Sequence, residues 1–596
     1  MQGDPSRPGP DSRAWLLVVI GLSVAVRLVY FAQAGEGPLR AMNGWDQSDM
    51  AFFDRWARVI AEGDWLTDRA LHPQHNWHHE IARRYFEAHP EAAAALAAGR
   101  GLSPEEASAE LWDRWYGGKT FHQEPLYPYL VAVTYRLLGP DPRFVFAWQL
   151  AVGVLANALV YVVARRLFPP PAPQVAGVLA ILCAPLLFYE MVLLRESLIV
   201  AAGLALVWLV LRAAERPDAL TWGLAGLAGG LSLLLKSSFL LFLLPALAVL
   251  AARPRPTWAA TLRRSAAWVA GAAIGLLPLA ARNVAVGLPP LALSSVGAIT
   301  FVNANTEDYP PEAGFFVSLA HAPEIMGTSQ GRFLPAALAA LRTHPGPGSY
   351  LRQIMGKLGA AWHWYEVPDN CSFYLYRLYA SILGLPVTFL LIGPLAIVGL
   401  FMALSVSRAW PLVLLVLASL ATMLVFYPSS RFRAPMAAAA IPLAAHALVK
   451  GAGFLVARRL APALAALLAL LAAFALTSRP LARGRPLLRG VDCRLPFLLF
   501  YGPAMEAAQG RGDWAGVAAA MREALASEPG FVRQAAPGRP PLGDDAFQCV
   551  SVYAVAHGNS AYALRQLGQT GAASVHERRA AGLEAALEEA RRRAGP

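Results

Sequence analysis

Long apolar runs recur along the chain from Ala14 to Ser478, and only short polar stretches separate them. A bilayer core of about 30 Å needs roughly 20 apolar residues per helix, so this pattern predicts a polytopic membrane protein of the all-α class. We expect about eleven membrane-spanning helices, together with interfacial helices. The predicted spans lie near residues 14–34, 143–164, 174–190, 196–212, 219–235, 237–252, 265–282, 381–404, 410–427, 434–449 and 458–477.

The runs also divide the chain into two regions. Residues 1–477 form the predicted transmembrane region, with a first external loop at 35–142 and a larger one at 283–380. Residues 478–596 are less apolar, and we expect them to form a small, soluble helical domain. Two of its segments look like tetratricopeptide units, although they lie farther apart than the roughly 34 residues of a regular array. This domain could dock a protein partner.

The first external loop begins with an amphipathic pattern, "NGWDQSDMAFFDRWARVIAEGDWL", whose apolar residues recur at spacings of three and four. It predicts a helix that lies along the membrane surface. Asp46 and Asp49 fall just before this helix or in its first turn, where a carboxylate suits the positive helix end. Helix capping explains both carboxylates as well as a catalytic role does. The later stretch "EPLYPYLVAVTYRLLG" is interpreted as a second interfacial helix.

The net charge of +12 is carried mainly by arginines in short loops between the apolar runs. Arginines in short loops between spans are explained by membrane orientation rather than by affinity for nucleic acid. We therefore expect no nucleic-acid partner. Arg7 and Arg13 precede the first span and place its start in the cytoplasm. Both external loops and the C-terminal domain then lie on the periplasmic or external side of the inner (plasma) membrane.

A lysine interrupts the apolar stretch at residues 219–252, although only four of the 51 lysines and arginines are lysines. A single helix over that stretch would be about 50 Å long, too long for one crossing, so the chain is expected to turn near Lys236, on the external side. A lysine that snorkels to the interface is the ordinary explanation. However, further cations fall on the same side, and ionisable groups at this depth are costly unless they are paired or used. These cations are Arg195, Arg282, Arg431 and Arg433.

At these residues the chain resembles the GT-C superfamily of integral membrane glycosyltransferases, in the bacterial branch related to protein O-mannosyltransferases and the aminoarabinose transferase of lipid A. The resemblance covers about residues 14–450. The first motif is an acidic pair, an aromatic residue and a helix that ends in Gly-Asp-Trp, matched by Asp49, Phe53 and "GDW". Met50 stands where many members carry a second acid, and Asp46 is the candidate replacement.

Five further motifs follow in the family's order. A surface helix rich in Pro and Leu is preceded by Glu124, an acid opens a span at Glu196, and a Lys opens a span containing Pro at Lys236. The last two motifs are an Arg-Asn pair followed by Gly and Asn, and Arg-x-Arg-x-Pro. They are matched by Arg282, Asn283, Gly297 and Asn305, and by Arg431 and Arg433 in "RFRAP".

The resemblance implies transfer of a sugar from a polyprenyl-phosphate-linked donor, with inversion, on the non-cytoplasmic side of the membrane. It implies that Asp49, supported by Asp46, acts as general base or orients the acceptor. Lysine and arginine suit a lipid phosphate, and the other candidate residues contact the substrate. The expected phosphate ligands are Lys236, Arg195, Arg282, Arg431 and Arg433, and the expected substrate contacts are Glu196, Glu124 and Asn305.

A transporter or flippase of lipid-linked saccharides is the alternative function. It predicts charges near mid-span and paired repeats, and neither pattern is found in the sequence. The sequence leaves open the identity of the sugar and whether the acceptor is a protein, a lipid or a glycan.

Residues 66–120 look like an insertion relative to the family, and five of the twelve histidines fall in its segment "LHPQHNWHHEIARRYFEAHP". His75 and His79 are four residues apart and could bind one metal from a helix face. Such spacing also arises by chance in polar inserts, so we assign no metal ligand and leave a divalent ion open as a cofactor. In the larger loop, three aromatic residues in or next to "HWYEVPDN", Trp362, Trp364 and Tyr365, could stack on a sugar, although packing at the interface is the more ordinary explanation.

Two of the four cysteines, Cys493 and Cys549, lie in the predicted external domain. An oxidising compartment permits a disulfide between them but does not require one. The sequence leaves this bond open.

Overall fold

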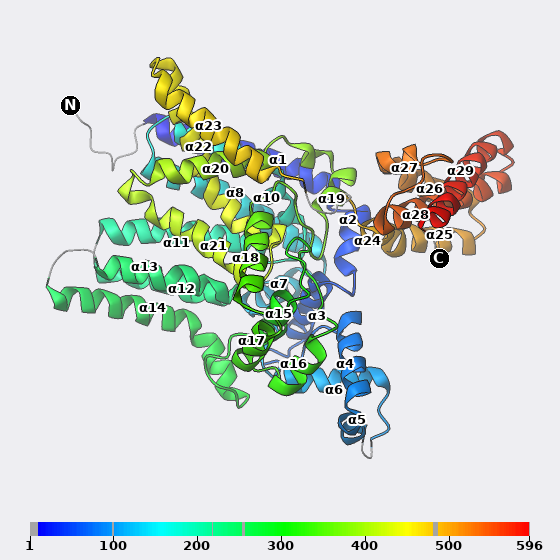
Figure 1. Ribbon diagram of the computed structural model, residues 1–596, viewed down its shortest axis with the longest axis horizontal. Coiled ribbons are helices and arrows are strands. Elements are labelled where there is room, and N and C mark those ends of the chain that lie inside the picture. The colour runs from blue at the N-terminus through cyan, green and yellow to red at the C-terminus, as the bar shows by residue number, and fades with distance from the viewer. Residues whose placement is uncertain (1–9, 98–99, 217, 253–256, 481–486, 595–596) are drawn as a thin grey trace. The chain divides into compact units, whose positions relative to one another are not determined.

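The computed structural model describes residues 10–97, 100–216, 218–252, 257–480 and 487–594 (Figure 1). Within these residues only isolated β-bridges interrupt an otherwise helical structure, which confirms the all-α prediction. The chain forms two compact units. The membrane unit comprises residues 1–28, 46–369 and 385–479, and the C-terminal unit comprises residues 29–45, 370–384 and 480–596.

Seven helices among the described residues are long and apolar enough to cross a membrane. Each falls on a predicted span, and the integral-membrane class is confirmed. Arg7, used to predict their orientation, lies outside the described residues. The helices are α1 (Pro10–Ala34), α8 (Pro142–Leu167), α11 (Glu196–Glu215), α14 (Trp258–Ala285), α21 (Trp410–Val425), α22 (Ser430–Val456) and α23 (Leu460–Thr477).

The four remaining predicted spans form shorter apolar helices. The predicted turn in residues 219–252 is present, because α12 ends at Leu233 and α13 begins at Leu240, with Lys236 between them. These helices are α9 (Ala172–Ile181), followed by α10 (Ala184–Phe188) and η2 (Tyr189–Met191); α12 (Ala219–Leu233), followed by η3 (Ser237–Phe239) and α13 (Leu240–Ala252); and α20 (Phe389–Ala403), followed by η5 (Ser407–Ala409).

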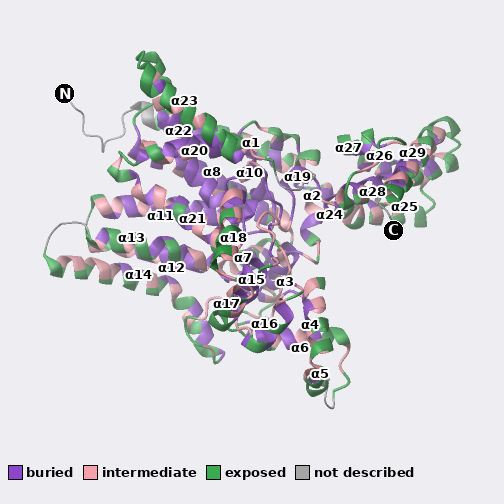
Figure 2. Cartoon of the chain, in the orientation of Figure 1, coloured by how far each residue is buried: buried purple, intermediate pink, exposed green. Residues whose placement is uncertain are grey.

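Helix α22 forms the centre of the membrane unit. Every residue from Ser430 to Ala447 is buried, and many are alanines whose small side chains let α8, α9, α11, α20 and α21 pack closely against it. The outer helices differ: only 11 % of the apolar window of α23 and 22 % of that of α14 is buried, compared with 61 % for α11 (Figure 2). The exposed apolar faces of α14 and α23 are therefore the surfaces available to lipid.

Glycines bring α12 and α14 into close contact. A Cβ added to Gly226 would lie 1.9 Å from the carbonyl oxygen of Trp268, and one added to Gly271 would lie 2.0 Å from that of Gly223. Neither position accepts a larger side chain without moving the helices apart. This packing fixes the end of α12, and hence the turn that carries Lys236.

The first external loop contains the predicted surface helices. Helix α3 buries Phe52, Phe53, Trp56 and Ile60 along one face, as the amphipathic pattern predicts. Helix α7 has 13 residues, which gives a length of about 20 Å, too short for a full crossing. The helices of this loop are α2 (Gly37–Ala41), η1 (Met42–Gly44), α3 (Asp49–Ala61), α4 (Asn76–Ala88), α5 (Pro90–Ala97), α6 (Pro104–Trp115) and α7 (Leu126–Leu138).

The larger external loop packs against the inserted helices α4 and α6. Trp112 and Trp115 of α6 share one apolar core with Val302 and Met326 of the larger loop. The insertion is thus part of the folded membrane unit. The helices of the larger loop in the membrane unit are α15 (Gly297–Asn305), α16 (Ala322–Ser329), α17 (Phe333–Arg342) and α18 (Pro347–Ala361). The next two helices, α19 (Phe373–Tyr379) and η4 (Ser381–Gly384), belong to the C-terminal unit.

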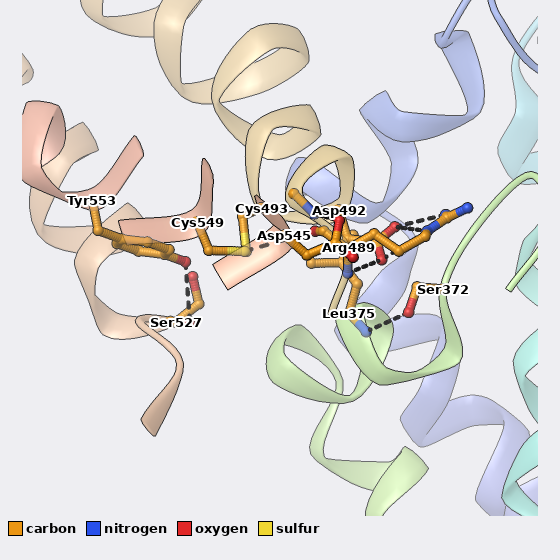
Figure 3. The surroundings of a disulfide bond; sticks show 10 residues. Ser372, Leu375, Arg489, Asp492, Cys493, Ser527, Asp545, Cys549 and Tyr553 are labelled. Carbon is orange, nitrogen blue, oxygen red and sulfur yellow. Dashed lines mark hydrogen bonds and ion pairs between the residues drawn. A yellow bond between two sulfur atoms is a disulfide. The ribbon is translucent and has the colours of Figure 1, made fainter. Parts of the chain in front are cut away.

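The C-terminal unit is helical, and Cys493 is bonded to Cys549 within it (Figure 3). Beside this disulfide, the backbone N–H of Gly490 donates to Asp545 at 2.8 Å. This unit contains paired helices, but the pairs do not test the tetratricopeptide assignment, which stays a prediction. Its helices are α24 (Gly490–Pro496), η6 (Phe497–Tyr501), α25 (Gly502–Gly510), α26 (Trp514–Ala526), α27 (Gly530–Gln534), α28 (Asp544–Gln566) and α29 (Thr570–Ala594).

Candidate active site

Charged side chains from distant segments meet at one end of the membrane unit. They come from the first residues of α3, α11 and α22, from the turn between α12 and α13, and from the segments that precede α7 and follow α18. We call this group the ionic cluster. Its members are Asp49, Glu124, Arg195, Glu196, Lys236, Asp369 and Arg431.

Arg431 connects three carboxylates of the ionic cluster. Its Nη1 donates to Oδ2 of Asp49 at 2.6 Å, and its Nε lies 3.1 Å from Oδ2 of Asp369 and 3.5 Å from Oε1 of Glu196. The phenolic O–H of Tyr427 also donates to Asp369, at 3.2 Å. One guanidinium thus neutralises part of the charge of three carboxylates, one buried and two partly buried, each from a different part of the chain.

Asp49 stands at the start of α3, which Ser48 caps by accepting a hydrogen bond from Ala51 at 3.3 Å. The side chain of Asp49 is 14 % exposed. Burial opposes ionisation, but the adjacent Arg431 guanidinium outweighs it and holds the pKa of the Asp49 carboxyl well below its ordinary value. Asp49 is therefore a carboxylate at any physiological pH.

Glu124 joins the segment before α7 to two other elements. Its Oε2 accepts from Nη1 of Arg195 at 2.6 Å, and its Oε1 accepts from the backbone N–H of Ser237 at 2.8 Å. Burial raises the pKa of the Glu124 carboxyl, but Arg195 and Ser237 together hold it below its ordinary value. Glu124 thereby fixes the start of α11 against the turn that carries Lys236.

Lys236 is the exceptional cation of the ionic cluster. Although the residue is only 9 % exposed, its ammonium forms no hydrogen bond or ion pair within the described part of the chain. Its Nζ lies 3.8 Å from the centre of the Phe432 ring, among the charges of Glu196, Arg195 and Arg431. An ammonium with so few direct partners is costly to bury, and it is available to an anion.

A small apolar cavity of about 20 Å³ lies beside Lys236. Its walls come from α11, η3, α13, α21 and α22 and are mainly hydrocarbon, with a few hydroxyl groups. The lining residues are Ile199, Lys236, Ser238, Phe239, Phe242, Leu415, Ala418, Ser419, Thr422, Phe432 and Pro435. The cavity has room for about one water molecule next to the Lys236 ammonium.

Two predicted site cations bind elsewhere in the membrane unit. Arg282 donates to the backbone carbonyls of Leu66 and Thr67, each at 2.7 Å, and lies 3.9 Å from the centre of the Phe121 ring. Arg433 pairs with Glu366 at 2.7 Å. These contacts position the external loops.

Asn305 and Asp46 also lie outside the ionic cluster. The Asn305 amide donates to the carbonyl of Val425 at 2.8 Å, and its oxygen accepts from Nζ of Lys357 at 2.9 Å, so both ends have protein partners. Asp46 is exposed, and its carboxylate faces His75. The roles of Arg282, Arg433, Asn305 and Asp46 in substrate binding remain predictions.

Two acidic residues that contact the predicted arginines were missed by the sequence analysis. Asp369 and Glu366 lie in "HWYEVPDN", for which the sequence predicted a role only for the aromatic residues. A signal was present, because two acids beside a predicted interface need cations and "RFRAP" supplies two. Of the aromatic residues, Trp362 packs on Phe389, with ring centres 5.9 Å apart.

The histidines of the insertion do not assemble into a metal centre. His79 is hydrogen bonded to the hydroxyl of Ser108 at 3.1 Å, whereas the His75 ring lies against His78, 5.4 Å away between centres. Within the described ranges, no group of three or more His, Cys, Asp or Glu residues could hold a metal ion.

The sequence of residues 122–282 matches the profile of a family described as dolichyl-phosphate-mannose-protein mannosyltransferase. The match includes Glu124, Arg195, Glu196, Lys236 and Arg282. The predicted resemblance to GT-C membrane glycosyltransferases is confirmed. For the rest of the GT-C-like region, including Asp49 and Arg431, the assignment depends on the geometry of the ionic cluster.

Two solved structures of GT-C-type transferases show distant similarity. The apo oligosaccharyltransferase of Archaeoglobus fulgidus is 15 % identical, with a TM-score of 0.37; the alignment covers 78 % of this chain and 56 % of that protein. ArnT from Cupriavidus metallidurans, bound to undecaprenyl phosphate, is 16 % identical, with a TM-score of 0.36 and coverages of 96 % and 76 %. The chain thus spans little more than half the length of the oligosaccharyltransferase. No curated protein matches it.

Proposed function

We propose that this protein transfers a sugar from a polyprenyl-phosphate-linked donor to an acceptor on the periplasmic or external side of the plasma membrane. The observation that carries the proposal is Lys236, whose buried ammonium faces an apolar cavity and forms no hydrogen bond or ion pair within the described residues. The family match over residues 122–282 supports the same class of donor.

The apolar surface of the membrane unit and the ionic cluster divide the donor between them. The isoprenoid chain lies against exposed apolar helix faces, where each buried CH₂ group contributes about 0.8 kcal/mol, because the cavity beside Lys236 is too small to hold it. Lys236 supplies a compact positive charge for the phosphate, and Arg431 supplies a planar fork that can clamp two phosphate oxygens. The sugar then lies toward Asp49, which Arg431 contacts.

Sugar transfer in this arrangement is a single displacement. The acceptor oxygen forms a bond to the anomeric carbon as its proton passes to a base beside Asp49, the bond from that carbon to the phosphate oxygen breaks, and its electron pair leaves with the lipid phosphate. Lys236 and Arg431 stabilise the charge that develops on this oxygen. Because a phosphate is a weakly basic leaving group, no general acid is needed.

Arg431 gives donor binding a second effect. In the absence of donor its guanidinium is occupied by Asp49, Asp369 and Glu196. A phosphate that attracts Arg431 weakens the 2.6 Å contact with Asp49 and frees that carboxylate to orient the acceptor hydroxyl. Donor binding would therefore precede acceptor binding.

The test is a transfer assay on the full chain in lipid nanodiscs. The donor is undecaprenyl phosphate carrying a radiolabelled hexose or pentose, and the acceptor is the cell envelope of a strain that lacks the gene. We expect Asp49→Asn to abolish transfer while donor binding persists, because the donor phosphate is held by cations that this change leaves in place. Asp54→Asn is the matched control: Asp54 lies on the same helix but pairs with Arg58 at 2.7 Å, outside the ionic cluster.

Two outcomes would contradict the proposal. The first is full transfer by Asp49→Asn. The second is movement of the labelled lipid across the bilayer with no sugar transferred by the unmodified protein, which is the behaviour of a flippase.

A further inference from the structure

The insertion at residues 66–120 brings histidines to the site of Asp49. His75 precedes α4 and His122 follows the insertion, and both interact electrostatically with the Asp49 carboxylate. The two residues are 7 % and 4 % exposed. A carboxylate with neighbouring imidazoles is a common arrangement for moving a proton.

His75 has a ring nitrogen that the fold does not use. Its Nε2 is buried and has no hydrogen-bond partner within the described residues, although the ring also interacts with the backbone of Ser48. Most buried polar side-chain atoms have a partner, so an unused one beside a catalytic carboxylate is notable. His79, four residues later and within α4, is instead hydrogen bonded to Ser108.

The surroundings of His75 favour the neutral ring. Burial lowers the pKa of the His75 imidazole, opposed by the Asp49 carboxylate, and the net pKa is below 6.5. The other charged or titratable groups that face His75 are Asp46, Arg55, His78 and His122. At neutral pH the ring is therefore a base, whereas Asp49, paired with Arg431, holds a proton poorly.

We propose that His75 is the base that accepts the proton of the acceptor hydroxyl, with Asp49 stabilising the imidazolium that forms. This inference rests on the proposed glycosyl transfer. As the acceptor oxygen bonds to the anomeric carbon, its proton passes to Nε2 of His75, and the electron pair of the broken bond leaves with the lipid phosphate. The phosphate gains one negative charge and His75 one positive charge, so the step balances without another reactant.

His75 is a better candidate than His122 for two reasons. His122 interacts with Arg195, whose positive charge disfavours an imidazolium, and burial lowers the pKa of its ring further than that of His75. The His122 ring is also packed between Tyr116 and Phe52, with ring centres 4.7 and 5.5 Å away. His122 therefore shapes the site but is poorly placed to carry a positive charge.

The test compares His75→Gln with His79→Gln in the full chain in nanodiscs, using undecaprenyl phosphate that carries the labelled sugar. We expect His75→Gln to lower kcat by about 10²-fold or more, the usual contribution of a general base, with little change in the donor KM. The unmodified protein should lose activity as the pH falls below 6.5, and His75→Gln should lack this acidic limb. His79→Gln should match the unmodified protein in rate and in pH profile.

Several results would overturn the inference. One is a His75→Gln variant that retains the rate or the acidic limb of the unmodified protein. If that variant does not fold, the unmodified protein still decides, because a transfer rate that is independent of pH from 5 to 8 excludes an imidazole base. An unmodified protein that transfers no sugar contradicts the proposed function itself, whereas transfer that does not depend on His75 contradicts only this inference.

Discussion

Two lysines of the membrane unit are buried, but their partners differ. Lys357, in α18, is completely buried, and its Nζ donates to Oδ1 of Asn305 and to the backbone carbonyls of Leu424 and Phe426 at 2.9, 3.2 and 2.7 Å. Lys236 is almost as buried, yet its Nζ forms no hydrogen bond or ion pair within the described residues; it lies over the Phe432 ring and beside a small cavity.

The contrast separates a structural lysine from one that is available to a ligand. Lys357 satisfies carbonyls at the end of α21 and ties the larger external loop to that helix, so its three donors are used. Lys236 has donors to spare, because the carboxylates around it pair with arginines, Glu196 with Arg431 and Glu124 with Arg195. Burial alone does not identify a binding residue; the number of unused donors does.

Removing Arg431 should have the largest effect on stability and should remove the difference in pairing between Lys236 and Lys357. In Arg431→Met, Asp49, Asp369 and Glu196 lose their shared cation, and we expect the free energy of unfolding to fall by about 3–5 kcal/mol. Thermal unfolding in detergent measures this loss. Arg58→Met, which removes a partly exposed ion pair with Asp54, should cost only about 0–1 kcal/mol. Equal stability losses in the two variants would show that Arg431 does not hold the ionic cluster together.

Lys236→Met should impair function without impairing the fold. We expect a loss of about 10²-fold in kcat/KM for the polyprenyl-phosphate sugar, because a charge-assisted contact to the phosphate contributes about 1.5–3 kcal/mol. Stability should stay the same or rise, since a poorly compensated ammonium is removed. Steady-state transfer kinetics and thermal unfolding test both parts, and a destabilised Lys236→Met with normal kinetics would reverse the interpretation.

Lys357→Met should show the opposite behaviour. It leaves the oxygen of Asn305 and two backbone carbonyls with fewer donors, and each deprived group costs about 1–3 kcal/mol. We expect lower thermal stability but a donor KM close to that of the unmodified protein. A Lys357→Met protein with normal stability and a raised donor KM would show that the wrong lysine has been assigned to the donor.

The smallest effect is the contribution of Lys357 to the pH dependence of stability. Burial lowers the pKa of the Lys357 ammonium to about 7, from 10.5 in an exposed lysine. Between these values the unfolded chain binds more protons than the folded one, so this residue makes stability rise with pH from about 7 to 10.5. Subtracting the unfolding profile of Lys357→Met from that of the unmodified protein isolates the contribution, and a flat difference would contradict it.

Much of the fold could be predicted because it depends on local patterns. Apolar length located the spanning helices, the spacing of Phe52, Phe53 and Trp56 predicted the buried face of α3, and the excessive length of residues 219–252 predicted the turn at Lys236. The packing of the insertion against the larger external loop could not be predicted, because Trp112 and Met326 meet only through the tertiary fold.

The candidate site was only partly predictable, because charge type does not reveal which charges pair. Arg431 and Arg433 are two residues apart, yet one binds Asp49 and Asp369 and the other binds Glu366. Their side chains leave α22 in different directions, and the partners come from a loop with no regular pattern. Asn305 was predicted from a motif alone. In the structure its side chain contacts Lys357 and the carbonyl of Val425 at the end of α21.

The most direct test of the central claim is equilibrium binding of undecaprenyl phosphate to the full chain in nanodiscs, compared between the unmodified protein and Lys236→Met, with Lys357→Met as the matched control. The account predicts that Lys236→Met raises the Kd about tenfold or more, while Lys357→Met leaves it unchanged. Equal affinities of the unmodified protein and Lys236→Met would contradict the assignment of Lys236 to the lipid phosphate.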